Sequence, residues 1–449
     1  MDGKLAPTRL GWIGIFRLGL VQAALGAIVI LTTSTLNRVM VVELVLPATL
    51  PGALVGWHYV VQLSRPRWGY GSDVGGARAP WILGGMIALA LGAVSAAGST
   101  ALMASQPVLG ILGAVFAFFV IGIGVGAAGT NMLALLATHT EPSRKAAAAA
   151  ITWIMMIIGF IVTAGVAGAM LDPFSMARLI QVTATVSLIA VMVSALAIWG
   201  LEGASKTRRD LNEAEAKPNF SAMLKEVWSD AQARRFTIFV AISMLAYSAQ
   251  DLILEPFAGL IYGYTPGEST RLAATQNMGV LLGMIVTAVL GTVVGKSRAR
   301  FMRKWTILGC LASAVALAAL CAAALVGPAW PLQPTVFALG VSNGAFAVAA
   351  IGSMMTLASA GRKGREGTRM GLWGAAQAIS FGVGGFLGAT ILDLARAVFA
   401  QTAPAFATVF AIEGVLFVVA AGCAAWVGDS TADDADLPVL PAGELVPAE

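Results

Sequence analysis

Two carboxylates and a proline lie close together in a strongly apolar part of the chain, in the run Gln250–Gly259. Asp251 and Glu255 are four residues apart and therefore share one face of a helix. An acidic side chain at mid-depth in a bilayer costs roughly 2.5–3.5 kcal/mol or more, so such residues normally have partners or a task. Pro256 has no N–H to donate and disfavours helical geometry in the residue before it. We therefore predict a kink or an end of the helix here, with the carbonyl of Leu252 left free.

A similar polar stretch ends the first predicted helix, where Arg38 and Glu43 precede Pro47. Residues five apart do not face one another on a straight α-helix, so we do not expect Arg38 to pair with Glu43. We hypothesise that Arg38 pairs with Asp251 or Glu255 across the two halves of the molecule. The alternative is an interfacial cluster reached by water. The candidate residues for ligand binding or helix pairing are Arg38, Glu43, His58, Gln250, Asp251, Glu255 and Pro256.

His58 is the only histidine that falls within a predicted membrane helix, because His139 falls in a loop. A neutral imidazole can ligate a metal, including the magnesium of a chlorophyll, through one nitrogen. A lone histidine in such a helix more often forms a hydrogen bond to a neighbouring helix. His58→Leu should reduce co-purified pigment if the ligand role holds. The three cysteines have no metal-ligand spacing and are expected to be packing thiols, so we predict no other metal site.

The composition excludes a soluble domain of this size. Of 449 residues, 58% are hydrophobic and only 11% are charged, whereas about a quarter of the residues of a soluble protein are charged. Apolar runs near the roughly 20 residues needed to cross a bilayer recur from end to end. We predict an all-α polytopic membrane protein whose twelve helices span residues 12–35, 44–64, 81–103, 108–137, 146–170, 180–200, 236–262, 271–294, 305–326, 333–358, 370–393 and 404–427.

The basic residues predict the orientation of the chain. Of 28 lysines and arginines, all but Arg38, Arg178, Arg271 and Arg396 lie in the head, at the first helix or in the loops on the side of the N-terminus. The positive-inside rule then places both termini in the cytoplasm. A pI of about 9.3 in such a chain indicates loops that face anionic lipid and not a nucleic-acid partner.

The chain divides into two related halves. The segment 168–172 resembles 388–393, and Gly122 with Gly126 recurs as Gly340 with Gly344. Repeats of six helices each predict the major facilitator fold, with two pseudo-symmetric halves. The predicted parts are an N-terminal half (1–200), a cytoplasmic linker (201–235), a C-terminal half (236–427) and an acidic, disordered tail (428–449).

The loop after the second predicted helix carries the candidate motif Arg65, Gly69, Asp73 and Arg78. It resembles the major facilitator loop in which glycine, an acidic residue and basic residues brace helix ends on the cytoplasmic side. The counterpart after the eighth predicted helix lacks the acidic member. The alternative is a simple positive-inside loop.

Three stretches together resemble the PucC/LhaA group, the bacteriochlorophyll-delivery branch of the major facilitator superfamily in phototrophic bacteria. They are 249–259, 65–73 and 36–40. Phe257 and Ala258 stand where a tyrosine and a glycine are expected in many members, which affects the subgroup more than the family. The resemblance extends over essentially the whole transmembrane region.

The resemblance implies a non-catalytic assembly factor for light-harvesting antenna complexes in the bacterial inner, intracytoplasmic photosynthetic membrane. The implied cargo is bacteriochlorophyll, with no covalent cofactor. The implied partners are antenna polypeptides, membrane lipid and bacteriochlorophyll with its biosynthetic enzymes. The body carries few intramembrane ionisable residues beyond Arg38, Asp251, Glu255 and His58, as expected for an apolar ligand.

The alternative function is a proton-coupled secondary transporter of a small molecule, in which Asp251 and Glu255 titrate. Uptake into vesicles that collapses with the proton gradient would favour it. An enzyme is the least favoured reading, because no nucleotide loop, catalytic triad or metal cluster is evident in the sequence.

Overall fold

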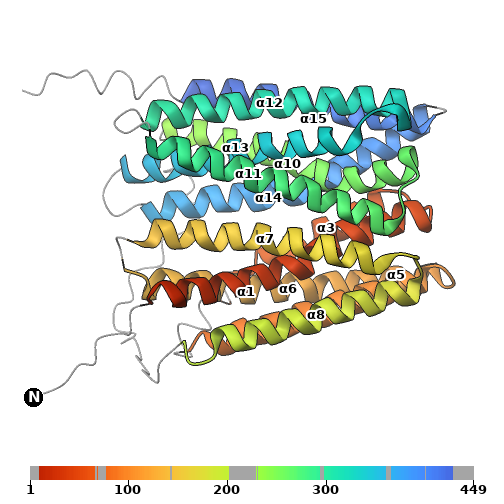
Figure 1. Ribbon diagram of the computed structural model, residues 1–449, viewed down its shortest axis with the longest axis horizontal. Helices are drawn as coiled ribbons and strands as arrows, with labels where there is room; N and C mark the ends of the chain where they lie inside the picture. The colour runs from red at the N-terminus through yellow and green to blue at the C-terminus, as the bar shows by residue number, and fades with distance from the viewer. Residues whose placement is uncertain are drawn as a thin grey trace, which may run out of the picture.

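The computed structural model describes residues 10–65, 68, 77–141, 144–201, 229, 231–293, 298–360, 366–399 and 401–427. These residues form a bundle of helices without strands (Figure 1), which confirms the predicted all-α class. Eleven helices in the described residues are long and apolar enough to cross a membrane. The predicted linker segment 202–228 and tail 428–449 lie outside the described residues, so the predicted domain boundaries stay a prediction.

The first half contains a continuous helix of four parts, α1 (Trp12–Ile30), η1 (Leu31–Thr35), α2 (Leu36–Arg38) and η2 (Val39–Glu43), followed by α3 (Thr49–Gln62), α5 (Ala79–Met103), α6 (Pro107–His139), α7 (Lys145–Leu171) and α8 (Met176–Ile198). The second half contains α10 (Ala231–Tyr262), α11 (Pro266–Val293), α12 (Arg298–Val326), the short η5 (Gly327–Ala329), α13 (Leu332–Ala360), α14 (Glu366–Val398) and α15 (Thr402–Val427).

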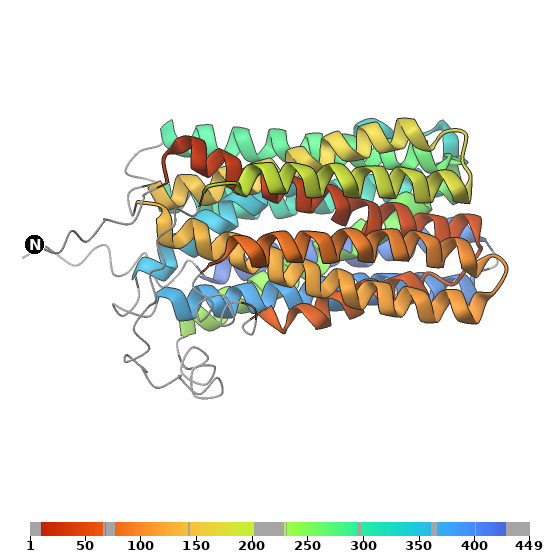
Figure 2. The same cartoon turned by 90° about the horizontal axis from the view of Figure 1, so that it is seen from below.

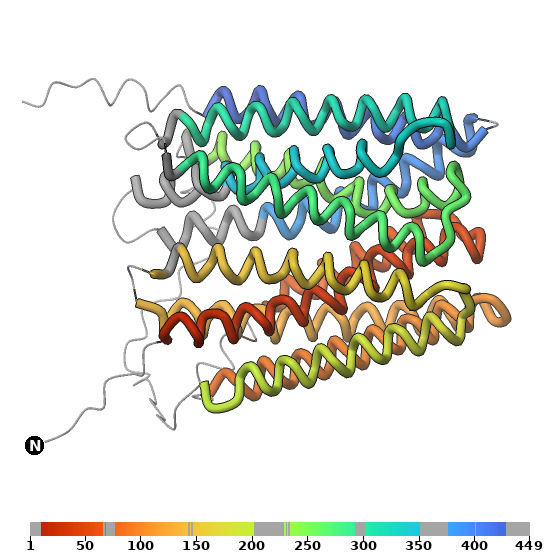
Figure 3. The backbone as a smooth tube through the Cα atoms, in the orientation of Figure 1, coloured from red at the N-terminus to blue at the C-terminus, as the bar shows by residue number. Residues whose placement is uncertain are grey.

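The helices run nearly parallel to one axis, and the two halves lie side by side along it (Figures 1 and 2). The start of α1 and the end of α15 lie at the same end of the bundle, as the tube shows (Figure 3). We call the opposite end the far end. Contacts between the halves join α7 to α11 and α3 to α14.

The boundary between the first two helices differs from the prediction. The first helix continues to Glu43 through the π-helical segments η1 and η2. The apolar periodicity does not reveal such segments, so the predicted helix ended too early. The next helix starts at Thr49 instead of residue 44. Between them Val45 has a φ of 53° and Pro47 cannot donate a helical hydrogen bond, which explains the break.

The start of α11 is another corrected boundary. The prediction was residue 271, but α11 begins at Pro266. The Glu268 N–H donates to Thr265 Oγ1 at 3.1 Å, and the Thr265 N–H donates to Glu268 Oε2 at 2.9 Å. This is a capping box, with Pro266 at the position where a missing N–H costs nothing. The start is therefore encoded locally.

The core of the second half is rich in phenylalanine. Phe257 of α10 packs against Phe406 and Phe410 of α15, with ring centroids 5.3 Å and 5.0 Å apart. In the same core Phe346 of α13 packs against Phe417. These rings hold α10 at the centre of the half, so the acidic residues on α10 have fixed surroundings.

Candidate functional site

Glu255 lies at the interface between the halves and is only 1% exposed. Its Oε1 accepts a hydrogen bond from Ser34 Oγ of η1 at 2.5 Å. Its Oε2 accepts from Ser269 Oγ at 3.2 Å and from Thr270 Oγ1 at 3.4 Å, both on α11. Thr270 Oγ1 is also 3.2 Å from Thr35 Oγ1 of η1. Hydrogen bonds offset the cost of burying a carboxyl group, so Glu255 is held by hydroxyls from both halves.

The sequence predicts that the helix kinks or ends at Pro256. It does not end there, because α10 continues to Tyr262. As predicted, the Leu252 carbonyl receives no hydrogen bond from Pro256 within the helix, and it is free to accept one from elsewhere. Asn37 Nδ2 of α2 donates to Leu252 O at 2.6 Å. A buried carbonyl without a partner is costly, so the missing N–H of Pro256 is compensated by a side chain from the other half.

Arg38 does not pair with Asp251 or Glu255, so that hypothesis is wrong. The guanidinium forms an ion pair with Glu43 and donates from Nη2 to Tyr264 O at 2.6 Å. On a straight α-helix Arg38 and Glu43 would not face each other. In the π-helical segment η2, hydrogen bonds run between residues five apart, so Arg38 and Glu43 lie one above the other. Arg38 still joins the two halves, through a carbonyl and not a carboxylate.

Two further contacts join the halves at the far end. Asp172, just after α7, forms an ion pair with Arg271 of α11 at 3.1 Å and accepts from Thr265 Oγ1 at 2.9 Å. Asp393 of α14 accepts from the N–H groups of Ala48 and Thr49 at 2.9 Å and 2.7 Å, and from Thr49 Oγ1 at 2.6 Å. We call these the Asp172 contact and the Asp393 contact.

Asp251 stands apart from its neighbour Glu255. It is half-buried, and it forms no hydrogen bond or ion pair with the part of the chain that the structure describes. Its charge lies near enough to act on the hydroxyls of Tyr59 on α3 and Tyr247 on α10. Tyr59 and Tyr247 both pack against Phe381 of α14. Asp251 therefore faces the region where the two halves meet.

Gln250 is fully buried inside the second half. Its Oε1 accepts from Asn343 Nδ2 at 3.0 Å, and Asn343 Oδ1 accepts from Ser313 Oγ at 2.9 Å. Gln250 Nε2 has no partner among the described residues. Side chains of α10, α12 and α13 thus form one hydrogen-bonded network, in which the Gln250 Nε2 donor is left unused by the described residues.

Glu413 of α15 is a buried acidic residue that the sequence reading missed. It is 2% exposed, and neither carboxylate oxygen has a hydrogen-bond partner among the described residues. Glu413 adds to the ionisable residues predicted within the membrane, which were Arg38, Asp251, Glu255 and His58. The available signal was simple, because Glu413 is the single charged residue in the run 402–427.

His58 is 2% exposed. Its Nδ1 is 2.9 Å from the carbonyl of Val55 in the same helix, and its ring lies 4.3 Å from that of Tyr59. Nε2 is therefore the nitrogen left for a ligand. Burial of the ring leaves no open face for a large macrocycle in this conformation.

The loop motif is described only in part, because Gly69 and Asp73 lie outside the described residues. Arg65 donates to Gln62 Oε1. Arg78 donates to Ala134 O at 2.7 Å and to Thr138 Oγ1 at 2.6 Å, so it holds the end of α6. The charge latch that includes Asp73 stays a prediction.

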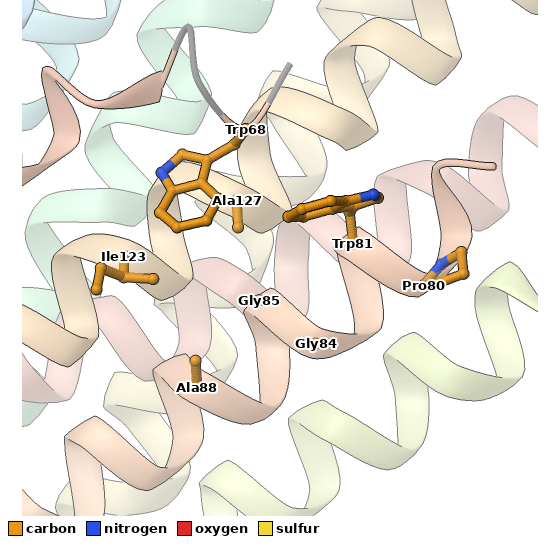
Figure 4. Close-up of a pocket in the computed structure, with 8 residues that line it drawn as sticks. All are labelled: Trp68, Pro80, Trp81, Gly84, Gly85, Ala88, Ile123 and Ala127. Atoms are coloured by element: carbon orange, nitrogen blue, oxygen red, sulfur yellow. The ribbon is translucent and has the colours of Figure 1, made fainter. Parts of the chain in front are cut away.

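An apolar groove of about 340 Å³ lies beside this motif, between α5 and α6 (Figure 4). The indole rings of Trp68 and Trp81 line it with centroids 6.1 Å apart. Gly84, Gly85, Ala88 and Ala127 contribute small side chains or none. The Trp68 Nε1 donates to Ser64 Oγ at 3.0 Å.

The fold is that of major facilitator transporters, which confirms the predicted fold class. The chain is similar to a solved nucleoside transporter, NupG, with a TM-score of 0.67 at 14% identity over 93% of this chain and 99% of that one. It is also similar to a peptide transporter, POT, with a TM-score of 0.67 at 16% identity over 94% and 97%. The protein is thus a multi-pass membrane protein with this fold.

Within this class the chain belongs to the PucC family, because residues 35–431 match the family described as PUCC protein. It is 51% identical to the "Bacteriochlorophyll synthase 44.5 kDa chain" of Rhodobacter capsulatus, over 97% of this chain and all of that one. It is 30% identical to "Protein PucC" of Cereibacter sphaeroides over 90% of each chain. The resemblance read from the sequence is confirmed.

Proposed function

We propose that this protein is a non-catalytic assembly factor for bacterial photosynthetic antenna complexes, which handles bacteriochlorophyll while antenna polypeptides are inserted. The observation that carries the pigment part of the proposal is the similarity, over 97% of this chain, to a relative whose name ties it to bacteriochlorophyll. Membership of the PucC family over residues 35–431 supports it further.

The polar groups of the described residues suit an apolar cargo. At the far end, Arg38 is bonded to Glu43 and to a backbone carbonyl, and Glu255 is bonded to hydroxyls. Asp393 is bonded to backbone N–H groups and a hydroxyl. An apolar cargo needs few polar contacts, whereas a polar solute needs several.

The proposed location is the bacterial inner, intracytoplasmic photosynthetic membrane, with both termini cytoplasmic. The support is the distribution of lysine and arginine along the sequence. The proposed partners are antenna polypeptides, bacteriochlorophyll and its biosynthetic enzymes, and membrane lipid.

His58 is the candidate ligand for the pigment magnesium. The contact of Nδ1 with Val55 O favours the tautomer in which Nε2 has a free lone pair. The ring must turn out of its packed position for a macrocycle to reach it. His58→Leu should lower the pigment that co-purifies with the protein, while His58→Gln is the polar control. Unchanged pigment in both variants would remove the ligand role.

A deletion strain of a phototrophic bacterium tests the proposed function. We expect loss of the antenna absorption bands in membranes of the strain, and their return when this chain is supplied on a plasmid. Normal antenna levels without the gene would reject the proposal. Reaction-centre absorption measured in the same membranes serves as the control for general effects on pigment synthesis.

A second candidate function is proton-coupled transport of a small molecule, which the unpaired carboxyl of Asp251 favours. It predicts uptake into vesicles that collapses with the proton gradient and is lost in Asp251→Asn. Flat uptake across a broad panel of solutes would count against it.

A further inference from the structure

The buried carboxyl of Glu413 lies inside the second half, away from the interface residues that hold Glu255. It is 2% exposed, and both of its oxygens lack hydrogen-bond partners within the described part of the chain. A buried carboxylate with neither a cation nor a hydrogen bond is far more costly than the neutral acid. The surroundings of Glu413 therefore decide which form the folded protein holds.

Glu413 lies on α15 between two contacts with α10. Arg235 near the start of α10 lies over the ring of Trp426 at 4.4 Å, and Phe257 near the other end packs on Phe410 at 5.0 Å. The two helices are therefore antiparallel, and Glu413 is level with the turn of α10 that precedes Phe257. On the α12 side, a side-chain atom on Gly414 would lie 3.6 Å from Ala314 O.

Gln250 of α10 does not supply the missing hydrogen bond. Its Oε1 is bonded to Asn343 and through it to Ser313, and its Nε2 has no partner among the described residues. The Glu413 oxygens therefore stay without a donor in this part of the chain.

The titratable groups that face Glu413 are acidic or neutral. Asp251 of α10 lies near enough for the two charges to interact, and Cys321 of α12 also lies within reach of Glu413. On the third neighbour, α14, the charged residues with described side chains are Asp393 and Arg396, near the far end. The described part of the chain therefore brings no cation to Glu413, and a second acidic group disfavours a negative charge there.

We infer that Glu413 binds a proton in the folded protein, so that its carboxyl is an internal proton-binding site in the second half. The protonated carboxyl needs no counter-ion, which suits a side chain that is 2% exposed and has no hydrogen-bond partner among the described residues. This site goes beyond the proposed function and does not depend on it.

Infrared spectroscopy of the purified full-length protein in lipid nanodiscs tests the inference directly. At neutral pH we expect the carbonyl band of a protonated carboxylic acid, and glutamate labelled with ¹³C at the side-chain carboxyl should shift it. Glu413→Gln should remove the band. Glu255→Gln is the matched control and should retain it, because Glu255 accepts three hydroxyl hydrogen bonds. Absence of a label-shifted band in the wild-type protein would overturn the inference without any variant.

Thermal unfolding in one detergent provides a second readout. An acid that is protonated when folded and ionised when unfolded makes the folding equilibrium constant fall by up to about tenfold per pH unit. The fall begins above about pH 4.3, where an unfolded glutamate ionises, and continues for as long as the folded protein keeps the proton. The unfolding midpoint of the wild type should therefore fall more between pH 6 and pH 9 than that of Glu413→Gln. Parallel falls in the two proteins would contradict a proton on Glu413.

Discussion

The Asp172 contact and the Asp393 contact occupy equivalent places in the two halves but are built differently. The similar segments 168–172 and 388–393 each bring an aspartate to the helix that faces it in the other half. Asp172 meets an arginine side chain, and both partners are substantially exposed, 31% and 43%. Asp393 meets two backbone N–H groups and a hydroxyl. The internal repeat therefore determines the positions of the two aspartates that join the halves. The groups that each aspartate meets determine how strong its contact is.

The Asp393 contact should be the stronger of the two. The N–H groups of Ala48 and Thr49 lie at the start of α3, where helix N–H groups have no partner within the helix. Asp393→Ala should lower the free energy of unfolding in mixed micelles by about 3 kcal/mol, because hydrogen bonds to a charged group are worth about 1.5–3 kcal/mol. Asp393→Asn keeps one acceptor oxygen and should lose clearly less. Equal losses of unfolding free energy in the two variants would show that the acceptor oxygens of Asp393 do not stabilise the protein.

Arg38 should couple energetically to Glu43 and not to Asp251. In a double-mutant cycle we expect Arg38→Ala and Glu43→Ala to be coupled by about 0.5–3 kcal/mol, the usual range for residues in direct contact. Arg38→Ala and Asp251→Asn should be additive within error. Strong coupling to Asp251 would restore the hypothesis drawn from the sequence.

Asn37 tests the compensation for Pro256. Asn37→Ala leaves Leu252 O without its partner, so it should cost about 1–2 kcal/mol of unfolding free energy. In a Pro256→Ala background the cost should fall, because residue 256 then has an N–H that can bond Leu252 O within the helix. The cycle is read by unfolding in mixed micelles. An undiminished cost in that background would mean that Asn37 stabilises the interface in another way.

The Asp172 contact should give the smallest effect. Exposed ion pairs contribute about 0–1 kcal/mol and are screened by salt. We expect Asp172→Asn to cost less than about 1 kcal/mol at low salt and almost nothing in high salt. A loss as large as that of Asp393→Ala would remove the distinction between the two contacts.

The sequence predicted the fold because lipid imposes long apolar helices and because the repeat is visible in glycine and acidic positions. It also predicted the free carbonyl at Leu252, since the effect of Pro256 is local. The partner of Arg38 was not predictable in the same way, because the π-helical segments at 31–35 and 39–43 change which residues face each other. The start of α11 was missed although its capping box is local. Glu413 was missed although it is the single charged residue in the run 402–427, because the prediction of functional residues relied on spacings between several residues.

The central claim, that this protein handles bacteriochlorophyll with antenna polypeptides, is tested most directly by mild purification from native photosynthetic membranes. An absorption spectrum of the purified protein and identification of the bound polypeptides by mass spectrometry form one measurement. A tagged transporter of the same fold, purified in the same way, is the control. The account predicts bacteriochlorophyll absorption and antenna polypeptides well above that control. A protein with no more pigment or antenna polypeptide than the control would contradict it.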